Sequence, residues 1–367
     1  MSKKLKIISV AGARPNFMKI APIARVAEKH PEVEHQIIHT GQHYDDMMSA
    51  SFFRDLGMKE PDVNLDVGSG SHAEQTARVL ERIAPVLEER RPDWLVVVGD
   101  VNSTLAATLA ASKMGIKTAH VEAGLRSFDR TMPEEINRIV TDALADLLLT
   151  HSKDADENLA KEGIDEEKIV RVGNIMIDSL VEKLKEADRL DLGEKFNVKR
   201  KEYVYVTIHR PSNVDEKDSL EKIADSLVKL SGEIEVVFPV HPRTKEKLSQ
   251  YGLQKKLSGK KGMKMIEPVG YVESLALASG ARFVLTDSGG IQEETTYLLV
   301  PCLTLRPNTE RPVTVSEGTN RLTNIELIEQ DIRDTMEGRH PKKDAKVPDL
   351  WDGNTAERII QVLLERA

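Results

Sequence analysis

The sequence predicts an α/β protein with two Rossmann-like, doubly wound domains that face each other across a cleft. Short apolar runs alternate with helical segments in a regular step, which is typical of parallel sheets with helices on both faces. The alternation is interrupted between Lys185 and Lys201, where charged residues dominate, and then resumes. A chain of 367 residues is also long enough for two domains of ordinary size.

In the first half, local signals fix most element boundaries. Pro31 ends the first helix, Ser71 and Glu74 form a capping box, and Pro133 suits the first turn of a helix. The nearly continuous apolar run Trp94–Val98 predicts a central strand that is buried on both faces. The predicted strands are 5–11, 35–39, 94–98, 117–121, 147–150 and 169–172, and the predicted helices are 17–29, 46–56, 71–90, 104–114, 133–145 and one from 153.

The second half repeats the pattern. Its predicted strands are 203–208, 234–240, 263–266, 282–286 and 302–305, and its predicted helices are 217–230, 245–256, 271–279 and 291–299. We read 185–201 as the connection between the domains. We expect an N-terminal domain of residues 1–172, joined by an amphipathic C-terminal helix at 354–367, and a C-terminal domain of residues 173–353.

Composition excludes several classes of protein. The net charge of −8 argues against a nucleic-acid partner. No apolar stretch approaches the ~20 residues of a membrane span, and the basic N-terminus lacks a cleavage site, so we expect a cytoplasmic protein. The single cysteine, Cys302, excludes an internal disulfide and a cysteine metal cluster.

The stretch Ala281–Val300 predicts a strand, a small-residue turn and a helix. The turn is Asp287, Ser288, Gly289 and Gly290. The N–H groups that open such a helix lie at the positive end of its dipole and favour a phosphate. Glu293 and Glu294 follow in what we take as the first turn of the helix, and one of them is a candidate for holding ribose. The alternative is a tight turn whose glycines serve packing.

The other informative positions directly follow strands. After the first strand, Arg14 and Lys19 place two cations beside a helix N-terminus, which suits a diphosphate. The alternative is that they are solvated surface charges. The run AGARPNFMK is not the GxGxxG dinucleotide fingerprint, and no suitable Walker sequence is present.

Three carboxylates are expected at the same sheet edge: Asp100, Glu122, and either Glu134 or Glu135. Crowded acids raise the pKa of at least one member and produce acid/base candidates. For Asp100 the alternative is capping of the following helix. For all of them, salt bridges to Arg126 or Arg138 are the structural alternative.

The second half contributes mainly histidines and arginines. His209 and Arg210 follow one strand, and His241 and Arg243 follow another. After the strand at 302–305 come Arg306, Glu310 and Arg311. This contrast with the acidic first half suggests a leaving diphosphate opposed to a sugar that loses a proton. A purely structural role is the alternative for His241.

Seven motifs in register over both halves resemble the non-hydrolysing UDP-N-acetylglucosamine 2-epimerase family. They are GARPNFMKIAP, GDVNSTLA, HVEAGLRS, MPEEINR, IHRPSN, DSGGIQEE and the step Glu310-Arg311-Pro312. The resemblance implies a GT-B-like fold, reversible conversion of UDP-GlcNAc to UDP-ManNAc through 2-acetamidoglucal, and a homodimer. Alternatives are a hydrolysing epimerase, an epimerase of a modified UDP-hexosamine, and a GT-B glycosyltransferase.

The resemblance also implies residue roles. Asp100, Glu122 and Glu134 would be the catalytic acids, and His209 would assist the departing diphosphate. The UDP-binding set would be Arg14, Lys19, Ser288, Gly289, Gly290 and Arg311, with Glu294 on the ribose. No metal site is apparent, and no bound NAD or other cofactor is expected. The pair Gln42-His43 resembles the activator segment of bacterial members, but the residues that follow it depart from their pattern.

Overall fold

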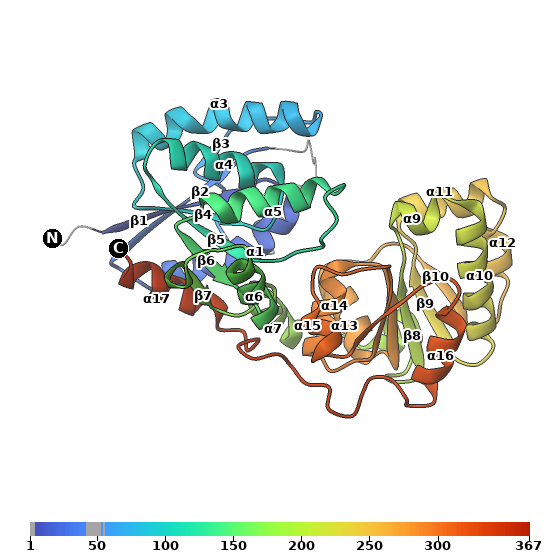
Figure 1. Cartoon of the computed structure of the whole chain (residues 1–367). Coiled ribbons are helices and arrows are strands. Elements are labelled where there is room, and N and C mark those ends of the chain that lie inside the picture. Colours follow the sequence, from blue (N-terminus) through green and yellow to red (C-terminus); the bar gives the residue numbers. More distant parts are fainter. Residues whose placement is uncertain (1–3, 42–52, 54–55) are drawn as a thin grey trace. The chain divides into compact units, whose positions relative to one another are not determined.

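The computed structural model describes residues 4–41, 53 and 56–367. The chain forms two compact units: unit 1 comprises residues 1–179 and 349–367, and unit 2 comprises residues 180–348. Each unit holds a parallel sheet with helices on both of its faces (Figure 1). The predicted fold class, an α/β protein with two doubly wound parallel sheets of the GT-B type, is confirmed.

The sheet of unit 1 has seven strands in the order β3-β2-β1-β4-β5-β6-β7. Their bounds are β1 Leu5–Ala11, β2 Val33–His39, β3 Val63–Asn64, β4 Trp94–Val98, β5 Lys117–Ala123, β6 Leu147–Thr150 and β7 Ile169–Arg171. The two-residue β3 is too short for an alternation pattern and was not predicted. The predicted helix 46–56 and the pair Gln42-His43 fall almost wholly outside the described residues.

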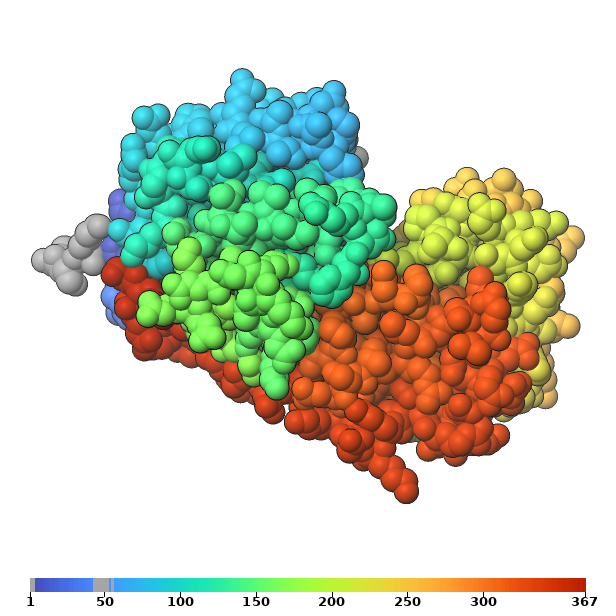
Figure 2. Space-filling model, viewed as in Figure 1, coloured from blue at the N-terminus to red at the C-terminus, as the bar shows by residue number. Residues whose placement is uncertain are grey.

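The helices of unit 1 cover both faces of this sheet. They are α1 Arg14–Ala27, α3 His72–Arg90, α4 Asn102–Lys113, α5 Pro133–Leu144, α6 Lys153–Lys161, the start of α7 Ile175–Ala187, and α17 Thr355–Glu365. In β4, Trp94, Val96 and Val98 pack toward α1 and α17, whereas Leu95 and Val97 pack toward α3 and α4. Burial on both faces explains the continuous apolar run. Figure 2 shows α3, α4 and α5 as adjacent bands on the surface.

The C-terminal helix α17 belongs to unit 1 and is capped by another helix. Its own N-cap residue, Asn354, makes no side-chain capping bond. Instead, the buried Asp178 of α7 accepts hydrogen bonds from the backbone N–H groups of Thr355 (3.1 Å) and Ala356 (2.7 Å). Because Asp178 and Ile175 are built into unit 1, the division between the units falls within α7 rather than at the predicted residue 172.

The sheet of unit 2 has six strands in the order β10-β9-β8-β11-β12-β13. The strands are β8 Tyr203–Thr207, β9 Glu235–Pro239, β10 Met263–Ile266, β11 Phe283–Thr286, β12 Cys302–Leu305 and β13 Asn320–Thr323. The helices are α8 Leu192–Phe196, α9 Pro211–Val214, α10 Lys217–Ser231, α11 Pro242–Gln250, α12 Gln254–Ser258, α13 Tyr271–Gly280, α14 Gly289–Tyr297, α15 Val313–Ser316 and α16 Ile328–Met336. The segment 185–201, which we read as a connection, lies within unit 2 and carries α8.

Candidate functional site

At the carboxyl edge of the unit 1 sheet, Asn16 joins the ends of two neighbouring strands. Its Oδ1 accepts hydrogen bonds from the N–H groups of Gly12 (3.0 Å) and Ala13 (2.9 Å), just after β1. Its Nδ2 donates to the carbonyl of Val98 at the end of β4 (3.1 Å). This buried side chain therefore fixes the floor on which the predicted acids lie.

Glu122 occupies a bulge in β5. The register with β6 shifts between Val121 and Ala123, and Glu122 has a left-handed backbone with φ of 69°. This conformation costs a residue other than glycine roughly 1–2 kcal/mol, so the surrounding structure must hold it in place. The buried carboxylate forms an ion pair with the ammonium group of Lys19.

Lys19 is therefore buried, and it is not the solvated surface charge of the alternative reading. Its ammonium group points to Glu122 and not to an exposed site for an anion. Gly99, which follows β4 with φ of 67°, lies against the same pair. A Cβ atom on Gly99 would come within 2.9 Å of Lys19 Nζ and 3.5 Å of Glu122 Oε2. Only glycine fits at position 99 without displacing this ion pair. The other predicted cation, Arg14, is exposed at the start of α1.

Asp100 follows Gly99 and pairs with the buried Arg138 of α5, at 2.5 Å between Oδ2 and Nη1. Its backbone carbonyl accepts a hydrogen bond from Asn137 (2.9 Å). The capping alternative for Asp100 is wrong, because the N-cap of α4 is Val101 and no side chain caps that helix. The predicted salt bridge to Arg138 is present, so Asp100 is held from α5.

The two glutamates that open α5 have different environments. Glu135 is buried and accepts hydrogen bonds from the N–H groups of Ser127 and Phe128 (both 2.9 Å) and from Arg138 (2.6 Å). Burial would raise the pKa of Glu135, but these donors hold it below its ordinary value. Glu134 is half-buried, and its carboxylate has no hydrogen-bond or ion-pair partner recorded within the described segments. Glu134 is therefore the member of the pair available to a ligand.

In unit 2, Asp287 organises the neighbouring strand ends. Its fully buried carboxylate follows β11 and accepts hydrogen bonds from the N–H groups of His209 (3.0 Å) and Arg210 (2.8 Å) and from Asn213 Nδ2 (2.9 Å). It also lies 2.9 Å from Nδ1 of the His209 ring. Burial would raise the pKa of Asp287, but His209 and Asn213 keep it below its ordinary value, so the carboxylate is ionised.

An ionised Asp287 requires that Nδ1 of His209 carries a hydrogen. The other ring nitrogen, Nε2, is then directed away from Asp287, and the side chain is 40% exposed. His241 lies beside it, with ring centroids 5.4 Å apart, but its Nδ1 accepts from the N–H of Arg243 (3.3 Å) and caps α11. This geometry supports the structural alternative for His241.

Helix α14 begins at Gly289, with Ser288 as its N-cap residue and no side-chain cap. The N–H of Ser288 donates to Thr286 Oγ1 (3.0 Å). Because the helix starts at Gly289, Glu293 and Glu294 lie in its second turn, so their placement in the first turn was wrong. No acidic residue therefore crowds the first N–H groups of α14.

The arginines of unit 2 are interleaved with acids. Arg306 and Glu310 form a two-pronged ion pair (2.7 and 3.0 Å). Arg311 Nε lies 2.9 Å from Glu293 Oε1, and its Nη1 is 3.5 Å from Glu310. Burial and the nearby Arg306 and Arg311 lower the pKa of Arg210. These guanidinium groups are therefore fixed close together, which is the arrangement that suits a multiply charged anion.

Known proteins of similar sequence show the family of this chain. The sequence profile of the UDP-N-acetylglucosamine 2-epimerase family matches residues 25–364. The UDP-N-acetylglucosamine 2-epimerase of Methanocaldococcus jannaschii is 43% identical over 98% of this chain and 99% of that protein. The chain belongs to this family.

A solved structure of the same M. jannaschii enzyme and one further relative are also similar to this chain. A crystal structure of the M. jannaschii enzyme in complex with UDP-GlcNAc and UDP has a TM-score of 0.85, with 98% of this chain and 100% of that chain covered. The UDP-2,3-diacetamido-2,3-dideoxy-D-glucuronate 2-epimerase of Pseudomonas aeruginosa is 37% identical over 98% of this chain and 99% of that protein. The family thus includes enzymes named for different sugar nucleotides.

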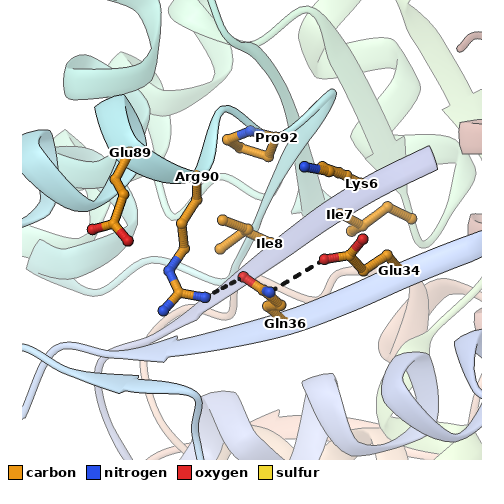
Figure 3. A pocket seen from close by; sticks show the side chains of 8 residues that line it. All are labelled: Lys6, Ile7, Ile8, Glu34, Gln36, Glu89, Arg90 and Pro92. Atoms are coloured by element: carbon orange, nitrogen blue, oxygen red, sulfur yellow. Dashed lines mark hydrogen bonds between the residues drawn. The ribbon is translucent and has the colours of Figure 1, made fainter. Parts of the chain in front are cut away.

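A pocket of this 2-epimerase lies at the opposite, amino edge of the unit 1 sheet, between β1, β2 and the end of α3. Figure 3 shows Arg90 donating to Gln36 (2.7 Å), which in turn donates to Glu34 (3.4 Å). In open α/β sheets, ligands bind at the carboxyl ends of the strands. The amino-edge pocket is therefore not the candidate site.

Glu294 of the 2-epimerase gives a prediction about stability. Burial raises the pKa of this carboxyl from 4.5 to about 7, and the Glu293 carboxylate adds to the rise. Between these values the native state keeps a proton that the unfolded chain has lost, so stability falls as pH rises. The expected loss between pH ~4.5 and ~7 is roughly 3 kcal/mol. Urea unfolding at several pH values, followed by circular dichroism, measures it.

In the Glu294→Gln variant the side chain at this position cannot ionise, so this fall in stability with rising pH should be absent. The matched control is Glu326→Gln, because Glu326 is an exposed glutamate of the same unit. The control should keep the wild-type slope of stability against pH. Parallel curves for wild type and Glu294→Gln would show that Glu294 is not protonated in the folded protein at neutral pH.

Two broader properties concern the described residues only. None of the helices there combines the length and apolar character that a membrane span requires. In residues 4–41, 53 and 56–367, no group of three or more His, Cys, Asp or Glu side chains is placed to hold a metal ion.

Proposed function

We propose that this protein interconverts UDP-GlcNAc and UDP-ManNAc without releasing the free sugar. The C2–H bond of a hexosamine is not adjacent to a carbonyl, so enolisation is not available. In the proposed first step a carboxylate takes the C2 proton, and the C–H electron pair forms a C1–C2 double bond. The C1–O bond breaks with its electrons to the β-phosphate of UDP. UDP then re-adds to C1 from the face that it left, and an acid delivers a proton to C2 from the face opposite to the one deprotonated, so only C2 is inverted.

The observation that carries this proposal is the pair of acids at the ends of β4 and β5. Asp100 follows β4 and Glu122 lies in the bulge near the end of the neighbouring β5, and each is paired with a basic residue from a helix, Arg138 and Lys19 respectively. These pairs fix both carboxylates at the same edge of the sheet, and a base must be held in place to take a proton from a bound sugar. Glu134 is a third acid whose carboxylate is accessible. Proton removal on one face and delivery on the other need at least two such groups.

Unit 2 supplies groups suited to the leaving UDP. Charge develops on the diphosphate as the C1–O bond breaks, so fixed donors there lower the barrier. His209, oriented by Asp287, offers Nε2, and the open N-terminus of α14 at Gly289 and Gly290 offers backbone N–H groups. Arg311 is the proposed cationic partner, and Glu294 the proposed ribose ligand.

The test is incubation with UDP-GlcNAc in D₂O, followed by ¹H NMR. The expected products are UDP-GlcNAc and UDP-ManNAc, both carrying deuterium at C2. Free ManNAc with UDP would indicate a hydrolysing enzyme, and the absence of exchange at C2 would contradict epimerisation of this substrate.

A second candidate substrate is a modified UDP-hexosamine. The P. aeruginosa relative, named for UDP-2,3-diacetamido-2,3-dideoxy-D-glucuronate, matches nearly the whole chain. The elimination involves only C1 and C2, so the same acids would serve it. Running both sugar nucleotides in the D₂O assay and comparing kcat/KM decides between them.

A further inference from the structure

Directly behind Glu122 lies a buried charge network that the proposed chemistry does not use. Its centre is Asp142 on α5, which is 1% exposed. One carboxylate oxygen lies 2.6 Å from Nδ1 of the fully buried His120. The other accepts from the N–H of Gly124 (3.1 Å) and from Arg126 Nη1 (2.7 Å). Arg126 in turn makes two bonds to Glu162 on the α6 side (2.6 and 2.7 Å).

The ring of His120 links this network to β4. Its Nε2 lies 2.9 Å from the carbonyl oxygen of Gly99. A carbonyl can only accept a hydrogen bond, and so can an ionised carboxylate, so both ring nitrogens of His120 must be donors. Burial would raise the pKa of Asp142, but His120 and Arg126 hold it below its ordinary value, so Asp142 is ionised.

The bonds from His120 and from Asp142 to Gly124 end close to the proposed catalytic acids. Gly99, whose carbonyl His120 holds, directly precedes Asp100 and packs against Lys19 and Glu122. His120 and Gly124 lie two residues on either side of Glu122, and Asp142 binds both. The carboxylate of Asp142 thus spans the bulge that keeps Glu122 left-handed.

Packing prevents the far side of the bulge from relaxing. Gly124 has φ of 79°, and a Cβ atom there would lie 2.4 Å from the carbonyl oxygen of Ala155 on α6. The bulge is therefore closed between α6 on one side and Asp142 on the other. If the Asp142 carboxylate were lost, the bulge could move only away from α6, and this movement would displace Glu122.

We propose that Asp142 is a positioning residue, which acts through His120 and Gly124 to set the relative placement of the Asp100 and Glu122 carboxylates. It does not touch the substrate. Proton transfer depends steeply on the placement of the base, whereas binding of the nucleotide by unit 2 does not depend on Asp142. The expected fall in kcat rests on the proposed function. The expected loosening of the bulge rests on its geometry alone.

The test variant is Asp142→Asn, in which one oxygen is replaced by an amide NH₂. The NH₂ group then faces either the donors Gly124 and Arg126, or Nδ1 of His120, which can accept from it only after losing its hydrogen. We expect kcat, per mole of folded enzyme, to fall about 10–100-fold, while KM for UDP-GlcNAc and Kd for UDP stay within about threefold. His120→Gln should have the same effect, and the double variant should lose no more than either single variant, because both remove one connection.

The matched control is Asp156→Asn. Asp156 also forms a partly buried ion pair in unit 1, with Arg171 (2.8 Å), but it has no contact with Gly99 or Glu122. It should lose stability and keep kcat. If Asp142→Asn keeps wild-type kcat, or if Asp156→Asn lowers kcat equally, the positioning role is wrong.

Hydrogen–deuterium exchange, read by mass spectrometry on peptides covering 117–128, tests the geometry without any turnover. Exchange there should be about tenfold faster in Asp142→Asn or His120→Gln than in wild type or Asp156→Asn. Unchanged exchange in both variants would overturn the inference even in an active enzyme. If wild type shows no C2 exchange with UDP-GlcNAc, the proposed function fails, and this measurement still decides whether Asp142 holds the bulge.

Discussion

Replacement of Glu122 by glutamine is expected to lower kcat for C2 exchange about 10²–10⁴-fold, the range for loss of a general base. The amide is nearly isosteric and can still accept a hydrogen bond from Lys19 through its oxygen, so the bulge should persist. It cannot take a proton from C2. The measurement is deuterium incorporation at C2 from D₂O, with UDP affinity determined by calorimetry.

Affinity for UDP should stay within about threefold of wild type, because Glu122 is not among the proposed nucleotide ligands and the lost group acts in the chemical step. Glu34→Gln is the control, because Glu34 is an exposed glutamate at the amino edge of the same sheet (Figure 3). It should retain full activity. Normal exchange in Glu122→Gln would assign proton removal to another acid, and loss of folding would show a structural role.

Replacement of Asp287 by asparagine is expected to lower kcat about 10²-fold or more. Losses of this size are typical when an enzyme loses a group that stabilises charge developing in the transition state. The Asp287 carboxylate accepts a hydrogen bond from Nδ1 of His209 and so fixes the orientation of the ring. An asparagine there can turn its NH₂ group toward Nδ1, and the ring then loses its fixed orientation. The measurement is kcat for epimerisation per mole of folded protein, because the variant also weakens the bonds to Arg210 and Asn213.

A double-variant cycle separates the orienting role of Asp287 from its structural role. If Asp287 acts through His209, Asp287→Asn should add little to the kcat loss of His209→Asn. Independent, multiplicative losses would indicate that Asp287 only holds the loop. Asn213→Ala is the control, since it removes a bond to Asp287 and keeps the contact between Asp287 and His209.

The strand ends were predictable from the sequence because an apolar run that stops at a polar residue marks the edge of a buried sheet. This signal located Asp100 and His209 just beyond strand ends, as the structure has them, whereas Glu122, predicted to follow its strand, lies in the bulge within β5. The signal fails where a strand is too short or too polar: β3 has two residues, and β13 reads NRLT, with a single apolar residue.

Pairing between distant residues was much less accessible. Lys19 and Glu122 are far apart in sequence and meet only because β1 and β5 flank β4. Asp142 lies in the last turn of α5 and reads as part of a polar helix face, although it is almost fully buried. The one available hint is that His120 and Arg126 flank a carboxylate motif and need an acidic partner. Sequence order does not say which acid supplies it.

The capping of α17 by Asp178 has a consequence for synthesis of the chain. One face of the unit 1 sheet is covered by Ile359, Ile360 and Leu363, which are made after the whole of unit 2. Domains that are continuous in sequence can fold as they emerge from the ribosome, N-terminal first. Here unit 2 has its complete sequence earlier, and unit 1 waits with one face uncovered until α17 arrives. Unit 1 is therefore the part of the nascent protein that most needs protection from aggregation.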